Sequence, residues 1–292
     1  MPDATVVTVD HLRDWPLPEP GADKEERGRV FVLGGSRTTP GAVLLATEAA
    51  LRTGAGKVQL ATVRSCASTL GVAVPELGVV PLEEDADGNI PAGEADRILE
   101  QAEGSGVTLV GSGFTDVETS TALLEPVMPR LEGTVVLDAL ATAYVTEDPE
   151  RVATLDAVVV LTVNPTELAR CLGVEEDDVT ADPEVHTARL ARRTGATVLC
   201  GGTVKVVASG DRVWVVRAGN PGLAVAGSGD VQAGIVAGLL GRGAEPDQAA
   251  VWGGFLHATA GERLAERVGP LGYLSRELPG ELPALLAALD RR

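Results

Sequence analysis

The stretch "GLAVAGSGDVQAGIVAGLL", residues 222–240, joins a glycine-rich turn to an apolar segment of helix length. Its glycines, Gly227 and Gly229, allow the backbone to approach a ligand closely. The helix that follows offers free amides and the positive end of its dipole, which together favour a phosphate group. Asp230 stands where this helix is expected to begin. It can cap the helix or take a proton from a hydroxyl group, and the spacing leaves both roles open.

Around this stretch, short β-branched runs alternate with amphipathic segments of helix length, which predicts parallel strands joined by crossover helices. Near-continuous Val and Leu within the runs indicates strands buried on both faces. The predicted strands are residues 29–35, 57–62, 106–113, 134–139, 157–162 and 196–202. After residue 203, "VKVVAS" and "RVWVVR" flank Gly210 and Asp211 and predict a β-hairpin. We therefore expect one α/β domain with a central, mostly parallel sheet, helices on both faces and a hairpin in the C-terminal half.

Composition excludes several classes of protein. The chain has 292 residues, 45% of them hydrophobic, enough for one large domain. Its net charge of −18 argues against nucleic-acid binding. We find no apolar run of bilayer length and no secretory signal in "MPDATVVTVD". The spacing of Cys66, Cys171 and Cys200 indicates neither disulfides nor a zinc site. We expect a cytoplasmic protein that binds neither nucleic acid nor membrane.

Three glycine-rich turns are the candidate ligand-binding elements: "GGSRTTPGA" (34–42), "GSG" (111–113) and "GSGD" (227–230). The first two follow predicted strands, and open α/β sheets bind ligands at the carboxyl ends of their strands. None of the turns matches the G-x-G-x-x-G pattern, and the chain holds neither a Walker lysine motif nor G-x-S-x-G. A Rossmann dinucleotide site, a P-loop and an α/β-hydrolase site are therefore disfavoured.

The segment "GSGDVQAGIVAGLLGRG" resembles the G-[ST]-G-D helix of ribokinase-fold enzymes. Further blocks in the same order resemble the ADP/ATP-dependent NAD(P)H-hydrate dehydratases within that fold, namely "VFVLGGSRTTPGAVLLATEAALRTGAGKVQLAT", "VPEL", "LTVNPTELARCLG", "NPGLAVAGSGD" and "LGYLSRELPGELPALL". The resemblance runs from about residue 28 to 289. It implies a ribokinase-like domain at residues 28–292, preceded by an N-terminal extension at residues 1–27.

The resemblance implies repair of a damaged nicotinamide cofactor. Water adds across a double bond of NADH or NADPH, and the family dehydrates the S epimer of the product. ADP or ATP phosphorylates the added hydroxyl group, and loss of phosphate restores the dihydronicotinamide. Hydroxide is a poor leaving group whereas phosphate is a good one, which explains the use of a nucleotide. The implied partners are hydrated NADH or NADPH and ADP or ATP, with Mg²⁺ bound largely through the nucleotide phosphates. The resemblance also implies a homo-oligomer, with a tetramer as a candidate state.

Carried over position by position, the resemblance makes Asp230 the catalytic group that activates the hydroxyl. The substrate-facing positions are Ala42, Gly113, Asn164 and Asp230. The nucleotide-facing positions are Gly227, Ser228, Gly229, Cys200, Gly201, Gly202, Thr203 and Val204. The metal ligands are not assigned; Asp138 and Glu167 are candidates that would act through water.

The chain departs from the family pattern at three positions. The usual "T-P-H-P-x-E" becomes "TVNPTE", with Asn164 in place of His; "L-D-A-D-A-L" becomes "LDALAT", with Leu140 in place of the second acid; and "L-K-G" becomes "LCG", with Cys200 in place of Lys. Cysteine cannot replace a cation. These departures keep two alternatives open: a small-molecule kinase of the same fold, and a nucleotide-binding paralogue without turnover. The sequence as a whole leaves open the preferred donor and the choice between NADH-hydrate and NADPH-hydrate.

Local chemistry offers structural explanations for several of these residues. Asn164, Pro165 and Glu167 match the start of a helix with a capping box. Asp138 ends a predicted strand, where a turn carboxylate and a metal ligand are equally good interpretations. His257 stands alone on an apolar helix and is expected to be a packed, hydrogen-bonded core histidine.

Overall fold

A computed structural model describes residues 4–289 of the chain. The strands are β1 (Thr5–Val6), β2 (Arg29–Leu33), β3 (Lys57–Val63), β4 (Gly78–Leu82), β5 (Val107–Val110), β6 (Thr134–Asp138), β7 (Val158–Val163), β8 (Thr197–Cys200), β9 (Lys205–Ser209) and β10 (Arg212–Val216). The α-helices are α1 (Val9–Asp14), α2 (Pro40–Arg52), α3 (Arg64–Ala73), α4 (Ala95–Ala102), α5 (Val117–Val127), α6 (Ala143–Glu147), α7 (Pro165–Leu172), α8 (Glu176–Ala181), α9 (Pro183–Thr194), α10 (Ser228–Gly241), α11 (Pro246–Arg267) and α12 (Leu278–Leu289). Within these residues no helix is both long and apolar enough to span a membrane.

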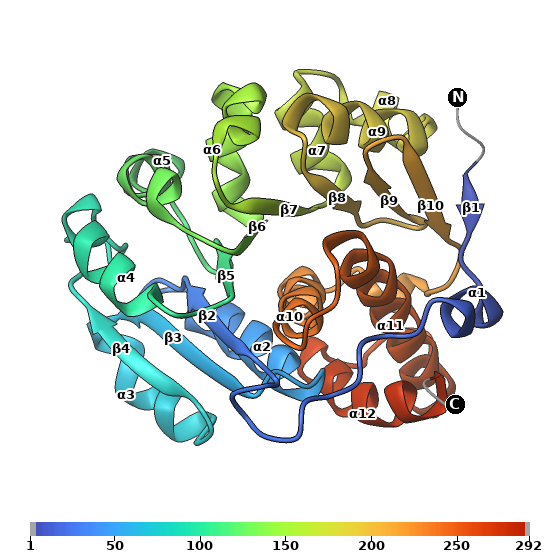
Figure 1. The fold of residues 1–292 in the computed structure, drawn as a ribbon, viewed down its shortest axis with the longest axis horizontal. Helices are drawn as coiled ribbons and strands as arrows, with labels where there is room; N and C mark the ends of the chain where they lie inside the picture. Colours follow the sequence, from blue (N-terminus) through green and yellow to red (C-terminus); the bar gives the residue numbers. More distant parts are fainter. Residues whose placement is uncertain (1–3, 290–292) are drawn as a thin grey trace.

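The strands form one sheet in the order β1-β10-β9-β8-β7-β6-β5-β2-β3-β4 (Figure 1). Pairing is parallel except on the two sides of β9, where β8 and β10 run antiparallel to it. The predicted strands and the hairpin turn at Gly210 and Asp211 are confirmed. Two strands were not predicted from the sequence: β1, which has only two residues, and β4, whose strand pattern Pro81 interrupts.

Helices cover both faces of the sheet, as expected for an α/β domain of this class. Helices α2, α10, α11 and α12 gather on one face, and α4, α5, α6, α7 and α9 lie on the other (Figure 1). Strand β2 shows how alternation supplies both cores: Val30 and Val32 pack with the first group, Phe31 and Leu33 with the second. All four side chains are fully buried, which explains why the sequence of this strand is a continuous apolar run.

The N-terminal segment is built into this fold. Strand β1 adds a parallel edge to β10, and Trp15 stacks on Trp214 with ring centroids 5.8 Å apart. The Trp15 carbonyl accepts hydrogen bonds from Trp252 Nε1 at 2.9 Å and Gln248 Nε2 at 3.3 Å, both on α11. Leu12 is fully buried in the core beneath. Residues 5–15 therefore close the edge of the sheet and cover part of α11.

Helix α10 lies close against α2 because it carries small residues on that side. A Cβ atom on Gly234 would lie 2.1 Å from the Ala46 carbonyl oxygen, and one on Gly238 would lie 2.1 Å from Thr53 Oγ1. Either contact is far shorter than van der Waals distance. The two glycines thus set how deeply α10 sits, and with it the position of the glycine-rich turn that precedes it.

Candidate functional site

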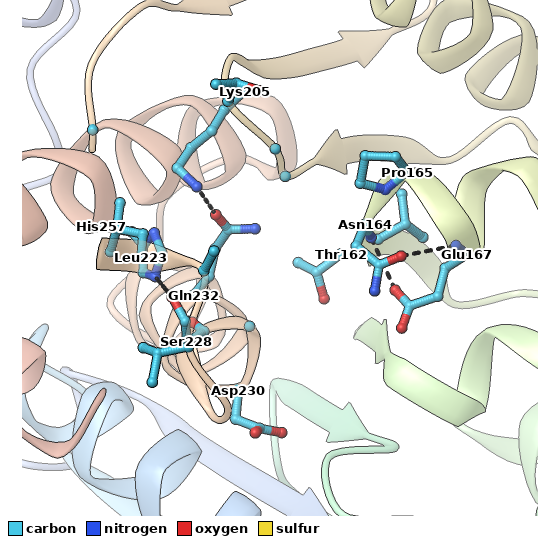
Figure 2. A pocket seen from close by; sticks show the side chains of 18 of the residues that line it. Thr162, Asn164, Pro165, Glu167, Lys205, Leu223, Ser228, Asp230, Gln232 and His257 are labelled. Atoms are coloured by element: carbon cyan, nitrogen blue, oxygen red, sulfur yellow. Dashed lines mark hydrogen bonds between the residues drawn. The ribbon is translucent and has the colours of Figure 1, made fainter. Parts of the chain in front are cut away.

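A cavity of about 750 Å³ opens at the carboxyl ends of β6, β7 and β8, beside the first turn of α10 (Figure 2). Three segments line it: the ends of β6 and β7 with the start of α7, the β8–β9 connection, and the 218–225 loop with α10 and α11. Its lining residues are Asp138, Ala139, Thr162, Val163, Asn164, Pro165, Glu167, Gly201, Gly202, Thr203, Lys205, Ala218, Gly219, Asn220, Pro221, Leu223, Ala224, Val225, Ser228, Gly229, Asp230, Gln232 and His257. Ligands of α/β sheets bind at this edge.

Helix α10 begins earlier than the sequence pattern indicated. Gly227 has φ +87° and precedes Ser228, the first helical residue, so Asp230 is the third residue of the helix and not its N-cap. The Ser228 amide donates to the Val225 carbonyl at 3.2 Å. No backbone carbonyl of residues 4–289 accepts from the amides of Gly229 or Asp230. These two amides and the helix dipole form an anion-binding end at the cavity wall.

Asp138 ends β6 as a buried carboxylate. It accepts hydrogen bonds from Ser112 Oγ at 2.9 Å and from Thr162 Oγ1 at 2.8 Å. Burial nevertheless raises the pKa of this carboxyl group above its ordinary value. The next residue, Ala139, has φ +50° and is the one non-glycine position of the described chain in the left-handed region. Backbone strain of this kind often marks functional sites.

Glu167 combines helix capping with a place in the cavity wall. The Asn164 side chain accepts from the Glu167 amide at 2.9 Å, and Glu167 Oε2 accepts from the Asn164 amide at 2.9 Å. Pro165 follows the cap, so the predicted capping box is confirmed. Burial first, and the charge of Asp138 second, raise the pKa of Glu167 to about 7. Near neutral pH the side chain is therefore part carboxylate and part acid.

Asp230 lies in the same electrostatic environment. Burial, and then the charges of Asp138 and Glu167, raise the pKa of Asp230 to about 7, and hydrogen bonding with Ser112 partly offsets the rise. Three carboxyl groups from β6, α7 and α10 thus repel one another across one site. A group that titrates near neutrality can take a proton and later release it.

The turns "GGSRTTPGA" and "GSG" meet next to these carboxylates. A Cβ on Gly111 would lie 2.0 Å from the Asp138 carbonyl oxygen, so glycine allows the ends of β5 and β6 to approach. Gly113 lies against Ala42, because a Cβ on Gly113 would be 3.1 Å from the Ala42 Cβ. Between the glycines, Ser112 hydrogen-bonds Asp138. Ala42 and Gly113 therefore lie close to the carboxylate cluster without lining the cavity itself.

On the other side of the α10 start lie groups that were not predicted from the sequence to belong to the site. His257 Nε2 contacts the Ser228 carbonyl oxygen at 2.9 Å and Ser228 Oγ at 3.0 Å. Burial, reinforced by the nearby Lys205, holds the pKa of His257 well below its usual range, so the ring is neutral. His257 is packed and hydrogen-bonded as predicted, yet it also lines the cavity. It holds the first residue of α10 in place.

The structure brings together most of the residues predicted for the site. The cavity lining includes Asp138, Asn164, Glu167, Gly201, Gly202, Thr203, Ser228, Gly229 and Asp230. Gly227, Val204 and Cys200 lie beside it but outside the lining. The Cys200 side chain is buried in the core beneath the opposite face of the sheet, and burial raises the pKa of its thiol to about 12. Leu140 follows the strained Ala139 in a 3₁₀ turn.

The acidic residues also suit a hard cation bound partly by phosphate. In the described chain no group of three or more His, Cys, Asp or Glu is arranged as a complete metal site. Carboxylate oxygens are nonetheless the ligands that Mg²⁺ prefers, and Asp138 and Glu167 present them at one edge of the cavity. A cation there would offset the burial of both carboxylates and the repulsion from Asp138 that adds to the rise in the pKa of Glu167.

Comparison with known proteins is consistent with this geometry. The sequence model described as NAD(P)H-hydrate dehydratase matches residues 30–284. The chain is 42% identical, over 99% of both chains, to the ADP-dependent (S)-NAD(P)H-hydrate dehydratase of Xanthomonas campestris pv. campestris. It is 35% identical to the bifunctional NAD(P)H-hydrate repair enzyme of Moorella thermoacetica, covering 94% of this chain and 52% of that enzyme.

The fold also matches a solved structure of the same kind. The ADP/ATP-dependent NAD(P)H-hydrate dehydratase of Bacillus subtilis, co-crystallised with ATP and Mg²⁺, superposes with a TM-score of 0.84 at 25% identity. The match covers 99% of this chain and 100% of that one. The ribokinase-like architecture predicted from the sequence is thereby confirmed.

Proposed function

Because this chain belongs to the NAD(P)H-hydrate dehydratase family, we propose that it restores NADH and NADPH from their S-hydrates, using ADP or ATP as phosphoryl donor. The reaction removes the elements of water from the nicotinamide ring, so the enzyme is a carbon–oxygen lyase. The observation that carries the proposal is Asp230, a group with a pKa of about 7 beside the free Gly229 amide in the cavity wall.

The phosphoryl-transfer step has groups in the site that can perform it, and elimination of phosphate completes the reaction. The Asp230 carboxylate accepts the proton of the added hydroxyl group while the hydroxyl oxygen attacks the terminal phosphorus of the nucleotide. AMP leaves from ADP, or ADP leaves from ATP, with the electrons of the broken bond. The carbon–oxygen bond to the new phosphate then breaks, phosphate departs with the electrons of that bond, and a neighbouring carbon gives up a proton to water, which restores the double bond. The amides of Gly229 and Asp230 stabilise charge on the transferring phosphoryl group.

The positions of the predicted substrate-facing and nucleotide-facing residues support the assignment of a different side of the cavity to each ligand. Asn164 lies at the edge with Glu167, and Ala42 and Gly113 lie behind the carboxylates, so we propose the hydrated nicotinamide on that side. Gly201, Gly202 and Thr203 line the cavity between Pro165 and Gln232, and with Ser228 and Gly229 they form the proposed nucleotide side. Mg²⁺, held by the nucleotide phosphates with Asp138 and Glu167 acting through water, would supply positive charge for the phosphoryl oxygens.

A direct assay tests this function. Purified protein is incubated with freshly prepared hydrated NADH or NADPH, Mg²⁺ and either ADP or ATP, and the return of dihydronicotinamide absorbance is followed. Recovery that requires a nucleotide supports the proposal and also gives the donor and substrate preferences. No recovery from a folded protein that binds ADP would instead favour the paralogue without turnover. Nucleotide consumption with another alcohol in place of the hydrate would favour a kinase.

We further propose that the protein is a cytoplasmic homo-oligomer, up to a tetramer. The family resemblance supports the assembly, and three free cysteines suit a reducing compartment. Light scattering coupled to size-exclusion chromatography measures the assembly directly, and a monomer at all concentrations would contradict it.

A further inference from the structure

Lys205 is a buried cation in the cavity wall that has no role in the reaction steps proposed above. It begins β9, is 4% exposed, and is the one Lys or Arg among the described residues that line the cavity. Its aliphatic stem packs against α11, where a Cβ on Gly254 would lie 3.6 Å from the Lys205 Cδ. The ammonium group is thus directed from the sheet edge toward the start of α10 (Figure 2).

Within the described chain the ammonium group has no anionic partner. Lys205 Nζ donates one hydrogen bond, at 2.8 Å, to the neutral Gln232 Oε1, and no salt bridge joins it to a carboxylate of these residues. An ammonium group has three donors, and a buried charge without a counter-charge is costly. Burial accordingly lowers the pKa of Lys205 to about 8, which still leaves it mostly protonated at neutral pH. A buried cation that faces a cavity with unused hydrogen-bond donors is suited to bind an anion.

The surroundings of Lys205 place that anion near the start of α10. Gln232 lies on α10 only one turn after Ser228, so the ammonium group is next to the turn whose Gly229 amide is free. In Figure 2, Lys205 and Asp230 lie on opposite sides of Ser228 and Gln232. The acidic and cationic groups therefore divide the cavity, with the free helix amides between them. A chain of phosphates with its terminal phosphorus near Asp230 would run toward Lys205.

Lys205 does not occupy the place that a lysine at position 200 would occupy, because the two side chains lie on different faces of the sheet. Cys200 belongs to the core on the α7 and α9 face of the sheet, whereas Lys205 and its strand neighbour Val207 face α10 and α11. The Lys205 charge on β9 therefore reaches the cavity from the face of the sheet opposite to that of Cys200. The other groups around Lys205 carry no compensating charge: the Cys200 thiol on β8 is protonated, His257 on α11 is neutral and Gln232 on α10 is an amide.

We propose that Lys205 binds the phosphate oxygens of the donor nucleotide and supplies the cationic charge of the nucleotide side of the site. The proposal rests on the function proposed above, because it takes the ligand to be ADP or ATP. Its chemical basis is a charge-assisted hydrogen bond in a desolvated position, which is stronger than the same contact at the surface.

Calorimetric titration with ADP, and with adenosine as the matched ligand without phosphates, tests the proposal. Lys205→Met removes the charge and keeps an unbranched side chain of similar length. We expect it to weaken ADP binding by about tenfold to a hundredfold and to leave adenosine binding unchanged. Lys57→Met, at a partly exposed lysine paired with Glu25, is the control and should bind ADP like the wild type. The melting temperature of Lys205→Met should stay constant or rise, because a buried charge is lost.

A second measurement needs no variant. An anion bound at Lys205 raises its pKa, so at pH 8 the wild type should take up as much as about half a proton on binding ADP. Titrations in two buffers of different ionisation enthalpy give this number, and Lys205→Met should lack that part of it.

Equal affinity of wild type and Lys205→Met for ADP would overturn the proposal, as would equal losses for ADP and adenosine or an absence of excess proton uptake. None of these results affects the dehydration assay. A wild type that neither binds ADP nor restores the cofactor would instead refute the proposed function.

Discussion

Asp230 belongs to the cluster of carboxyl groups in the site and is also the proposed base of the reaction. Its carboxyl group is crowded by Asp138 and Glu167, and the repulsion is part of the reason that it titrates near neutrality. A residue that is useful as a base here is therefore also a source of strain in the fold.

We predict that Asp230→Asn lowers kcat by a factor on the order of 10² to 10⁴, because the amide cannot accept the proton. The same change should raise stability above pH 7 by on the order of 1 kcal/mol, visible as a higher melting temperature. The sign follows from the pKa, which is higher in the folded state than in the unfolded chain. Ionisation therefore costs stability as pH rises from about 4 to about 7. Full activity of this variant would reduce Asp230 to a structural residue.

The dependence of kcat on pH should follow the carboxylate cluster. Because Asp230 acts as a base with a pKa of about 7, kcat should rise about tenfold per pH unit below pH 7 and level off above it. Glu167→Gln removes one like charge while keeping the capping geometry, so the midpoint should move to lower pH. Activity that is constant from pH 5.5 to 8.5 would exclude a titrating base in the rate-limiting step.

Helix α10 is the element on which the site depends, because it holds Ser228, Asp230 and Gln232 along one turn. Its depth against α2 is set by glycines, and its first residue is held by His257 from α11. Apolar packing far from the ligands thus determines where the helix amides point. No local propensity of residues 228–232 would place them there.

We predict that Gly234→Ala destabilises the protein by about 1–3 kcal/mol, since its Cβ would lie 2.1 Å from the Ala46 carbonyl oxygen. The displaced helix should also weaken ADP binding. Gly280→Ala is the matched control on α12, where a Cβ meets nothing within 4 Å, and it should be neutral or stabilising by about 0.5–1 kcal/mol. Urea denaturation and calorimetry measure both effects, and equal behaviour of the two variants would contradict this account of the α10–α2 contact.

At the scale of the whole molecule, the N-terminal segment behaves as part of the domain. It adds β1 to the sheet, covers Trp214 and accepts hydrogen bonds from α11, although it precedes residues 30–284, which match the family model. The contacts that join it to the rest of the domain are long-range, as between Trp15 and Trp252.

We therefore predict that Leu12→Ala lowers the free energy of unfolding by about 2–5 kcal/mol, because the side chain is fully buried in the main core. Val9→Ala on the same helix, at a side chain 37% exposed, should change it by less than about 0.5 kcal/mol. The comparison uses equilibrium denaturation of the full chain. A small effect at both positions would mean that residues 1–27 form a dispensable extension.

Local chemistry along the chain was enough to predict the strands other than β1 and β4, the hairpin, the capping box at Asn164 and Glu167 and the turn that carries Asp230. These features depend on residues a few positions apart, through alternation, glycine conformation and hydrogen bonding near the same backbone. Long-range packing decided the rest. It joined Ser112 to Asp138, buried Asp230 beside Asp138 and Glu167 so that its pKa is raised, and directed Lys205 and His257 into the cavity. The physical reason is that the face of a strand or helix turned toward a ligand, and the burial that shifts a charge, depend on neighbours distant in sequence.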